Sequence, residues 1–212
     1  MRPLRTDIDE RVDLGAAELM IRRPADSESL IDEERFADDE FLPYWAELWP
    51  SGLALARHLA TLDLADKHVL EVGCGLALPS FAATIAGARV LATDWAPECV
   101  ELVERNAQAN GLTVDAAVLN WRAPASLGHQ RFGLLVAADV LYEQRNADPL
   151  LVLLDAVVSA AGAALIADPG RRHAPAFFAR AREEGWSVEP TAIAALPAGG
   201  IFRLQRQTQE TG

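Results

Sequence analysis

The sequence predicts an α/β fold in which helices cover both faces of a mostly parallel β-sheet. Three observations support this prediction. Short apolar runs alternate with segments of helical hydrophobic spacing from residue 53 onward, and alternating strands and helices build parallel sheets buried on both faces. Glycines follow several helical segments, as is typical of helix C-termini. Polar side chains end several apolar runs, at Asp94, Asn120, Asp139 and Asp168.

The N-terminal quarter of the chain is less regular. Residues 12–22 predict one or two short strands, and residues 29–36 predict a short acidic helix. An aromatic patch follows at residues 41–52, with the sequence Phe-Leu-Pro-Tyr-Trp-Ala-Glu-Leu-Trp-Pro-Ser-Gly. Residues 53–62 have apolar side chains at helical spacing, and Ser51 is a plausible N-cap for that helix. We expect residues 1–45 to form an extension that packs over the functional site.

The elements after the patch alternate in order. We expect seven strands, at residues 68–72, 89–93, 114–119, 132–138, 163–167, 187–193 and 201–205. We expect helices between them at residues 76–86, 97–109, 149–161 and 174–184, of which the third is closed by Gly162. The short Gly-rich link between the last two strands predicts that the final strand is antiparallel. The sheet is then doubly wound, and residues 1–212 form one domain with a frayed polar tail.

Composition narrows the classes of function. The chain has 212 residues, 50% of them hydrophobic, which suits a single core. Its formal net charge of -12 disfavours nucleic acid and fits a cationic partner. The two cysteines lack metal or disulfide spacing, which favours a reducing cytoplasm, and no pair of histidines has ligand spacing, so we expect no metal site. We expect neither a signal peptide nor a membrane-spanning segment, and the sequence leaves the oligomeric state open.

The strongest motif is Glu71-Val-Gly-Cys-Gly75, which lies between a predicted strand and a predicted helix. Gly73 and Gly75 let the backbone turn tightly and approach a ligand. A dinucleotide-binding loop needs a third glycine, but Leu78 stands at that position. An acid at Glu71 suits the sulfonium and amino group of S-adenosylmethionine, and Asp94 ends the second strand, where an acid binds ribose hydroxyls. The loop and Asp94 together predict an S-adenosylmethionine site.

Further residues fit the same cofactor. The amide of Asn120 is able to hydrogen-bond the adenine edge, and Trp121 is able to stack on its face. Trp95, beside Asp94, is a candidate for a second aromatic wall. Burial as ordinary core residues is the competing explanation for these tryptophans and for the patch at residues 41–52.

Asp139-Val-Leu-Tyr142 follows the fourth strand and is the candidate acceptor site. Methyl transfer needs a neutral nucleophile, and a lysine with a usual pKa of about 10.4 must first lose its proton. Asp139 is the expected orienting carboxylate, and Tyr142 is the expected aromatic wall and hydroxyl partner. The competing explanation makes Asp139 a helix cap.

Asp168-Pro-Gly-Arg171 ends the fifth strand. Asp168 is a candidate for holding a cationic acceptor, and Arg171 is expected to meet an acidic neighbour. A simple turn, with Pro and Gly in turn positions, is an equal alternative.

Together, these motifs resemble the seven-β-strand methyltransferases, in particular methyltransferase family 16, over residues 40–172. The resemblance implies a Rossmann-like methyltransferase sheet and an S-adenosylmethionine-dependent protein-lysine N-methyltransferase, whose partner is a protein that presents a lysine. It implies that Trp49, Glu71, Gly73, Asp94 and Trp121 contact S-adenosylmethionine, and that Asp139 and Tyr142 frame the lysine.

Residues 43–46, 49–52, 139–142 and 168–171 resemble one branch of this family, the lysine methyltransferases of the electron transfer flavoprotein β-subunit. The glycine loop of this chain is shorter than the extended Gly-rich loop of that branch. Four alternatives stay open. They are a methyltransferase of a small-molecule amine or another protein nitrogen, a nucleobase methyltransferase, a non-catalytic cofactor-binding protein and a NAD oxidoreductase. The acidity of the chain and the absence of an Asn/Asp-Pro-Pro-Tyr motif disfavour a nucleobase methyltransferase. The presence of both Asp139 and Tyr142 disfavours a non-catalytic protein, and the missing third glycine disfavours a NAD oxidoreductase.

Overall fold

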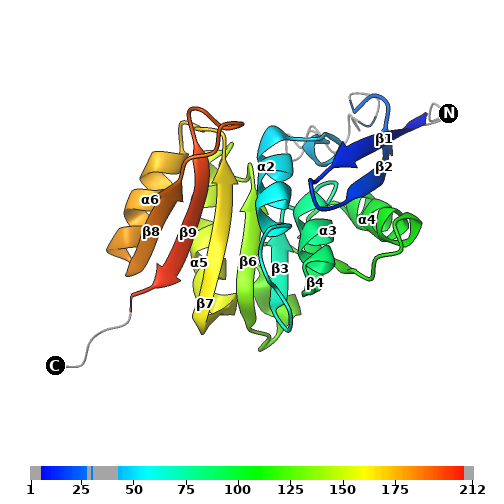
Figure 1. The fold of residues 1–212 in the computed structure, drawn as a ribbon. Coiled ribbons are helices and arrows are strands. Elements are labelled where there is room, and N and C mark those ends of the chain that lie inside the picture. Colours follow the sequence, from blue (N-terminus) through cyan, green and yellow to red (C-terminus); the bar gives the residue numbers. More distant parts are fainter. Residues whose placement is uncertain (1–5, 28–29, 31–42, 208–212) are drawn as a thin grey trace.

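The computed structural model describes residues 6–27, 30 and 43–207. Its centre is a seven-stranded sheet in the order β5-β4-β3-β6-β7-β9-β8 (Figure 1). The strands are β3 (His68–Val72), β4 (Arg89–Asp94), β5 (Asp115–Val118), β6 (Phe132–Ala138), β7 (Val158–Asp168), β8 (Trp186–Thr191) and β9 (Gly200–Arg206).

The strand directions confirm the predicted fold class. Strands β5, β4, β3, β6 and β7 run parallel to one another. The last strand in the chain, β9, is antiparallel to both β7 and β8, between which it is inserted. The chain runs outward from β3 to β4 and β5, and then crosses back to β6 on the other side of β3. The carboxyl ends of β3 and β6 therefore flank a topological switch point, where open α/β sheets bind ligands.

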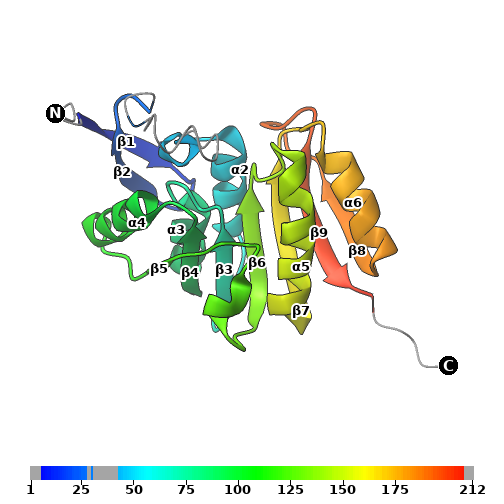
Figure 2. The same ribbon diagram turned by 180° about the vertical axis from the view of Figure 1, so that it is seen from behind.

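Helices cover both faces of the sheet (Figures 1 and 2). The helices are α2 (Pro50–Leu59), α3 (Leu78–Ile85), α4 (Pro97–Ala109), α5 (Ala147–Val157) and α6 (Ala174–Glu183). Alternate strand residues separate the two cores: Val69 and Val136 pack with α2, α3 and α4, whereas Leu70 and Leu135 pack with α5 and α6. This alternation is why the strands read as continuous apolar runs.

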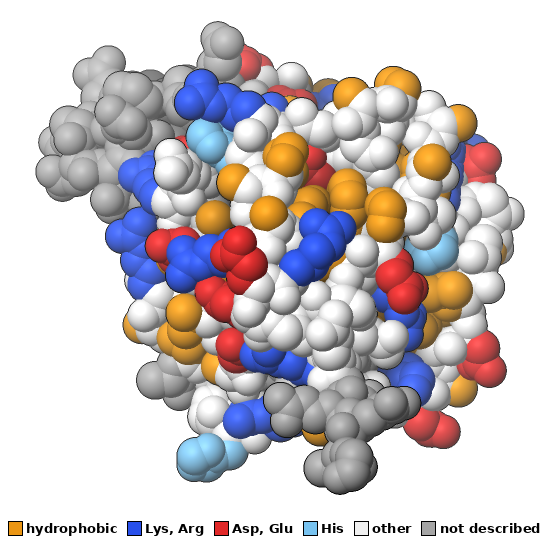
Figure 3. All heavy atoms as spheres, turned by 90° about the vertical axis from the view of Figure 1, so that its left-hand side faces the viewer, with side chains coloured by type: hydrophobic (Ala, Val, Ile, Leu, Met, Phe, Trp, Pro, Cys, Tyr) orange, Lys and Arg blue, Asp and Glu red, His pale blue; other side chains and the backbone are white. Residues whose placement is uncertain are grey.

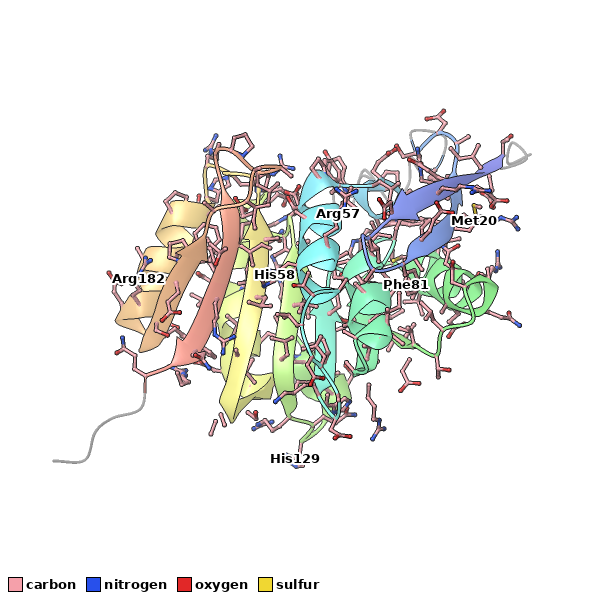
Figure 4. The ribbon with its side chains drawn as sticks, viewed as in Figure 1. Met20, Arg57, His58, Phe81, His129 and Arg182 are labelled. Atoms are coloured by element: carbon pink, nitrogen blue, oxygen red, sulfur yellow. The ribbon has the colours of Figure 1, made fainter. Side chains whose placement is uncertain are left out.

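The predicted N-terminal strands form a separate hairpin of β1 (Asp7–Asp13) and β2 (Glu18–Pro24). Asn106 of α4 and Asn110, the C-cap residue of that helix, bind the backbone of this hairpin. Asn110 accepts from Met20 N and donates to Met20 O, both at 2.8 Å, and Asn106 does the same with Arg22, both at 2.9 Å. Arg57 of α2 adds a bond from Nε to the carbonyl oxygen of Asp13 at 3.0 Å (Figure 4). The hairpin is thereby fixed against α4 and α2.

Two sequence predictions about element ends are wrong. Ser51 is not an N-cap, because α2 begins one residue earlier at Pro50, with Trp49 as its N-cap, and proline favours the first helical position. Gly162 does not close a helix, because α5 ends at Val157 and β7 begins at once with Val158. A Cβ on Gly162 would lie 3.0 Å from the Phe132 carbonyl oxygen, so close approach of β6 explains this glycine. The helix predicted at residues 29–36 lies outside the described residues, apart from Leu30.

Among the described residues, no helix combines the length and apolarity needed to span a membrane. Figure 3 shows the edge of the sheet formed by β8, where basic and acidic side chains are interspersed. Ion pairs account for part of this pattern, since Arg180 binds Glu184 and Asp148, and Arg206 binds Asp155. The net acidity of the chain does not form a single acidic patch on this face.

Candidate active site

A cavity of about 570 Å³ opens at the carboxyl ends of the parallel strands, which is an ordinary size for a small-molecule site. The loops after β3, β4, β5 and β6 contribute to its wall, together with the 3-10 helix η2 (Tyr44–Ala46) and the start of α2. Ten of the residues predicted for the site line this cavity: Trp49, Glu71, Gly73, Gly75, Asp94, Trp95, Asn120, Trp121, Asp139 and Tyr142. Asp168 and Arg171, the candidates after β7, are not among its lining residues. The topology thus brings together side chains that are spread over more than ninety residues of sequence.

The glycine loop forms a tightly packed floor. Gly73 and Gly75 have φ values of 63° and 50°, a region that favours glycine. A Cβ on Gly73 would lie 3.0 Å from Val140 Cγ1 and 3.3 Å from the Trp121 ring, and one on Gly75 would lie 3.1 Å from the Trp45 carbonyl oxygen. Both glycines are therefore required by backbone conformation and by close neighbours.

Two buried carboxylates stabilise this loop. Asp94 accepts a hydrogen bond from Gly75 N at 3.0 Å and another from Ala96 N at 3.2 Å. Glu71 accepts from Ser80 N at 2.9 Å and also from the Ser80 hydroxyl, at the start of α3. Burial raises the pKa of both acids, and that of Glu71 reaches about 8. Glu71 is therefore largely protonated at neutral pH, and its carboxyl group is already bound to Ser80.

The aromatic residues after β4 and β5 differ in exposure. Trp121 is partly buried against Gly73 and the core under α5, whereas the side chain of Trp95 is 36% exposed. Asn120 uses its Oδ1 to accept from Arg122 N at 3.0 Å, which closes a turn. Its amide nitrogen is the part of the side chain that remains suited to a purine edge.

An aromatic group lines a further part of the cavity. Tyr44 makes edge-to-face contacts with Trp49 and with Tyr142, at ring centroid distances of 6.0 and 5.7 Å. Trp49 Nε1 also donates to the Tyr44 carbonyl oxygen at 2.8 Å. Burial raises the pKa of the Tyr142 hydroxyl, so this group stays protonated at neutral pH. We refer to Tyr44, Trp49 and Tyr142 as the aromatic cluster.

Asp139 lies beside this cluster in a strained backbone conformation. Its φ is 59°, which is uncommon for a residue other than glycine, and its backbone N donates to the Ala167 carbonyl oxygen of β7 at 2.9 Å. Its buried carboxylate accepts from Arg171 Nε at 2.7 Å and from Ser51 Oγ at 3.5 Å. Because α5 begins only at Ala147, the alternative that made Asp139 a helix cap is wrong.

The segment after β7 supplies the partner of Asp139. As the sequence predicts, Arg171 meets an acidic neighbour, and its guanidinium also lies 5.7 Å from the centroid of the Trp49 ring. Asp168 Oδ1 accepts from the backbone N of Gly170 and of Arg171, at 2.8 and 2.7 Å, so the predicted turn is present as well. Among the described residues, Asp168 Oδ2 is the buried side-chain oxygen without a hydrogen-bond partner.

The sequence alone predicted no role at the site for Tyr44, Ser80 or the two cysteines. It also did not predict that Ser51 lies beside Asp139. Cys74 Sγ and Cys99 Sγ lie 3.9 Å apart as free thiols, and with Asp94 they form a buried group whose candidate ligand atoms lie within 4.8 Å of one another. Because Cys74 and Cys99 lie on separate elements, their spacing in the sequence did not indicate that the two thiols are close. The histidines are not part of this group: His58 lies on α2 and His129 at the opposite end of the sheet (Figure 4).

The family model for lysine methyltransferases matches residues 37–184. The chain belongs to this family. It is 37% identical over 139 residues to an electron transfer flavoprotein β-subunit lysine methyltransferase from Rattus norvegicus, covering 61% of this chain and 51% of that protein. It is 34% identical over 116 residues to the histone-arginine methyltransferase METTL23 from Xenopus laevis, covering 51% of this chain and 50% of that protein.

The lysine methyltransferase family member described here spans about half the length of the curated relatives that it matches. Solved structures agree on the fold. A ribosomal protein L11 methylase from Lactobacillus delbrueckii has a TM-score of 0.57 at 24% identity, covering 73% of this chain and 78% of that chain. Magnesium protoporphyrin IX methyltransferase from Synechocystis has a TM-score of 0.60 at 16% identity, covering 74% and 84%. These likenesses establish the Rossmann-like methyltransferase fold.

The cavity fits S-adenosylmethionine, the cofactor that the sequence predicts. Gly73, Cys74 and Gly75 all line the cavity, so the glycine loop borders the space that a ligand would fill. The Asp94 carboxylate, at the end of β4, suits ribose hydroxyls, and Trp95 and Trp121 suit a purine ring. The cavity therefore offers groups for the ribose and the base.

Proposed function

We propose that this protein is a protein-lysine N-methyltransferase that uses S-adenosylmethionine and acts on the electron transfer flavoprotein β-subunit. One observation carries the proposal. The glycine loop and Asp94, at the carboxyl ends of β3 and β4, line the same cavity as Asp139 and the aromatic cluster. A cofactor site and a site suited to an amine are thus continuous.

We assign the residues of the cavity to two groups. Trp49, Glu71, Gly73, Gly75, Asp94, Trp95, Asn120 and Trp121 bind the cofactor, which supplies the methyl group when bound. Asp139 and Tyr142 are the catalytic residues. They hold the acceptor nitrogen in line with that methyl group, so that catalysis depends mainly on positioning and electrostatics. The ring faces of the aromatic cluster suit a methylated ammonium product.

The substrate assignment rests on the relatives and on four segments. The first curated relative acts on the electron transfer flavoprotein β-subunit, and residues 43–46, 49–52, 139–142 and 168–171 are the segments that resemble its branch. A lysine side chain is cationic in solution, which suits approach to a chain with a net charge of -12.

A direct experiment is to incubate the purified protein with deuterated-methyl S-adenosylmethionine and recombinant electron transfer flavoprotein. Peptide mass spectrometry should then find labelled lysines in the β-subunit. Label confined to arginine, or found only after small amines are added, would replace the proposal with the alternative, methylation of another protein nitrogen or a small-molecule amine. The histone-arginine relative is the observation that favours this alternative.

We also propose that residues 1–212 form one domain, in which residues 1–45 pack over the site, and that the protein is cytoplasmic and binds no nucleic acid. The free thiols of Cys74 and Cys99 support a reducing compartment. The position of Tyr44 in the cavity wall supports the packing of the N-terminal extension.

A further inference from the structure

The Asp139 carboxylate already has a cationic partner within the chain. Arg171 Nε lies 2.7 Å from Asp139 Oδ1, and the two side chains are 36% and 6% exposed, respectively. The same guanidinium lies over the Trp49 ring at 5.7 Å. Carboxylate and aromatic face are the two groups that would receive the ammonium of a lysine. Arg171 therefore contacts the carboxylate that we assign to the acceptor and one ring of the aromatic cluster beside it.

The backbone holds Arg171 in this place. The turn is closed by two hydrogen bonds to Asp168 Oδ1, from the backbone N of Gly170 and of Arg171. It also packs against the link between β8 and β9, because a Cβ on Gly170 would lie 2.6 Å from the Ala198 carbonyl oxygen and one on Gly199 would lie 1.9 Å from the Asp168 carbonyl oxygen. Two glycines thus allow close contact between the loops, and the contact between Arg171 and Asp139 rests on a well-packed turn.

This pairing matters because the reaction needs an uncharged amine. A lysine has a usual pKa of about 10.4, and a buried unpaired carboxylate raises it further by favouring the charged form. A guanidinium on that carboxylate offsets its charge. An amine bound beside the ion pair then gains less from keeping its proton, so a larger fraction is ready to attack.

The other groups around the pair do not replace Arg171. Ser51 faces Asp139 from α2 and is uncharged. Asp168, in the turn after β7, adds a second negative charge, and Tyr44 from η2 also acts on Arg171. Tyr142 is protonated at neutral pH, and its own charged neighbours are Glu143, Asp94 and Arg145. Among these groups, Arg171 is the cation that contacts Asp139.

We propose that Arg171 is a positioning residue, an internal counter-ion of Asp139 that makes the acceptor site select the neutral form of the amine. This inference rests on the proposed function, since it assigns the acceptor to Asp139. It predicts a preference for neutral over protonated amines at that carboxylate, which is measurable without knowing the protein substrate.

The first test measures binding of n-butylammonium, a fragment of the lysine side chain, to the complex with S-adenosylhomocysteine by NMR titration at pH 7.5. Arg171→Gln should bind this cation at least about fivefold more tightly than wild type, because Asp139 is then unpaired. Asp139→Asn in the same background should abolish the gain, and Arg171→Lys should stay close to wild type. Arg180→Gln, on the exposed face of α6, is the matched control and should change nothing. Equal or weaker binding by Arg171→Gln would overturn the inference.

The second test follows methyl transfer to the electron transfer flavoprotein against pH. In Arg171→Gln the acid limb of kcat should move up by about one pH unit, with activity recovering toward wild type above that limb. A loss of kcat that is equal at every pH would instead mark a purely structural role and overturn the inference. Failure of the proposed function would look different: wild type would not label the flavoprotein, while the n-butylammonium test would still decide the role of Arg171.

Discussion

Two parts of the cavity wall are fixed by different kinds of contact. We call the part around Asp94 and Glu71 the cofactor end and the part around Asp139 the acceptor end. At the cofactor end, Asp94 and Glu71 accept hydrogen bonds from backbone N–H groups of residues within twenty positions in sequence. At the acceptor end, Asp139 is bound by the side chains of Ser51 and Arg171, which lie 88 and 32 positions away. The first end is a local motif with a fixed backbone. The second is an assembly of distant side chains, and single substitutions there should alter substrate handling without disturbing the cofactor.

The largest effect is expected from Asp139→Asn. The substitution keeps the shape of the side chain and removes the charge that orients the acceptor. We expect turnover to fall about 10²–10³-fold, comparable to the loss of one preorganised electrostatic contact. Calorimetry should give an S-adenosylmethionine Kd within about twofold of wild type.

Asp148→Asn, an exposed acid on α5, is the matched control for that variant. If Asp139→Asn instead lost cofactor binding, the two ends would not be separable, and Asp139 would belong to the cofactor site.

At the other end, Asp94→Asn should have the opposite signature. Losing a charged acceptor of hydroxyl hydrogen bonds costs about 1.5–3 kcal/mol, so the cofactor Kd should rise about 10–100-fold. The kcat at saturating cofactor should change much less, and titration calorimetry with steady-state kinetics would separate the two parameters. Asp115→Asn, exposed on β5, is the control. An unchanged Kd would remove Asp94 from the cofactor site.

Gly199→Ala probes the backbone of the acceptor end alone. The new Cβ would lie 1.9 Å from the Asp168 carbonyl oxygen, so the loop must shift. We expect a destabilisation of roughly 2 kcal/mol, which lowers Tm by about 4–8 °C in a protein of this size. Calorimetric scanning checks this, and turnover should fall while cofactor affinity is retained.

Gly133→Ala is its control, because a Cβ there has no neighbour closer than 3.9 Å. Equal Tm values for the two variants would show that the packing around Gly199 does not restrain the loop.

The smallest effect concerns pH and the buried Glu71. Burial raises its pKa from the usual 4.5 to about 8, so the native state holds this proton between those values while the unfolded state releases it. The free energy of unfolding should therefore fall as pH rises through that window. For one proton the slope inside that window approaches about 1.4 kcal/mol per pH unit, and we expect Glu71→Gln to remove it.

Urea unfolding at pH 5 and pH 8.5, without cofactor, measures the difference between wild type and Glu71→Gln. Glu101→Gln, on the exposed side of α4, should keep the wild-type slope. A wild-type slope in Glu71→Gln would mean that another group carries the pH dependence.

The same contrast explains how far the sequence predicts the structure. The glycine loop and Asp94 were predictable because each follows directly from its own strand and turn. The fold was predictable from the alternation of short apolar runs with segments of helical hydrophobic spacing. The end of α5 was not predictable, because the apolar and small residues around Val157 fit both a helix and a strand.

At the acceptor end, the sequence indicated that Arg171 meets an acid but not which one. That answer required β7 to lie beside β6, so that the two loops meet. The contact of Ser51 with Asp139 was hidden for a similar reason. It depends on the packing of α2 against β6 and β7. From the sequence alone, Ser51 was predicted to be a helix cap instead.

Asn106 of α4 and its C-cap residue Asn110 have a consequence for solubility. Asn106 and Asn110 are four residues apart on a helix, a rise of about 6 Å, which nearly equals the spacing of Arg22 and Met20 along an extended strand. Each side-chain amide both donates to and accepts from the β2 backbone, as a neighbouring strand would. An open strand edge invites pairing with another chain. By occupying these backbone groups, Asn106 and Asn110 shield the outer edge of β2 from edge-to-edge pairing with another chain.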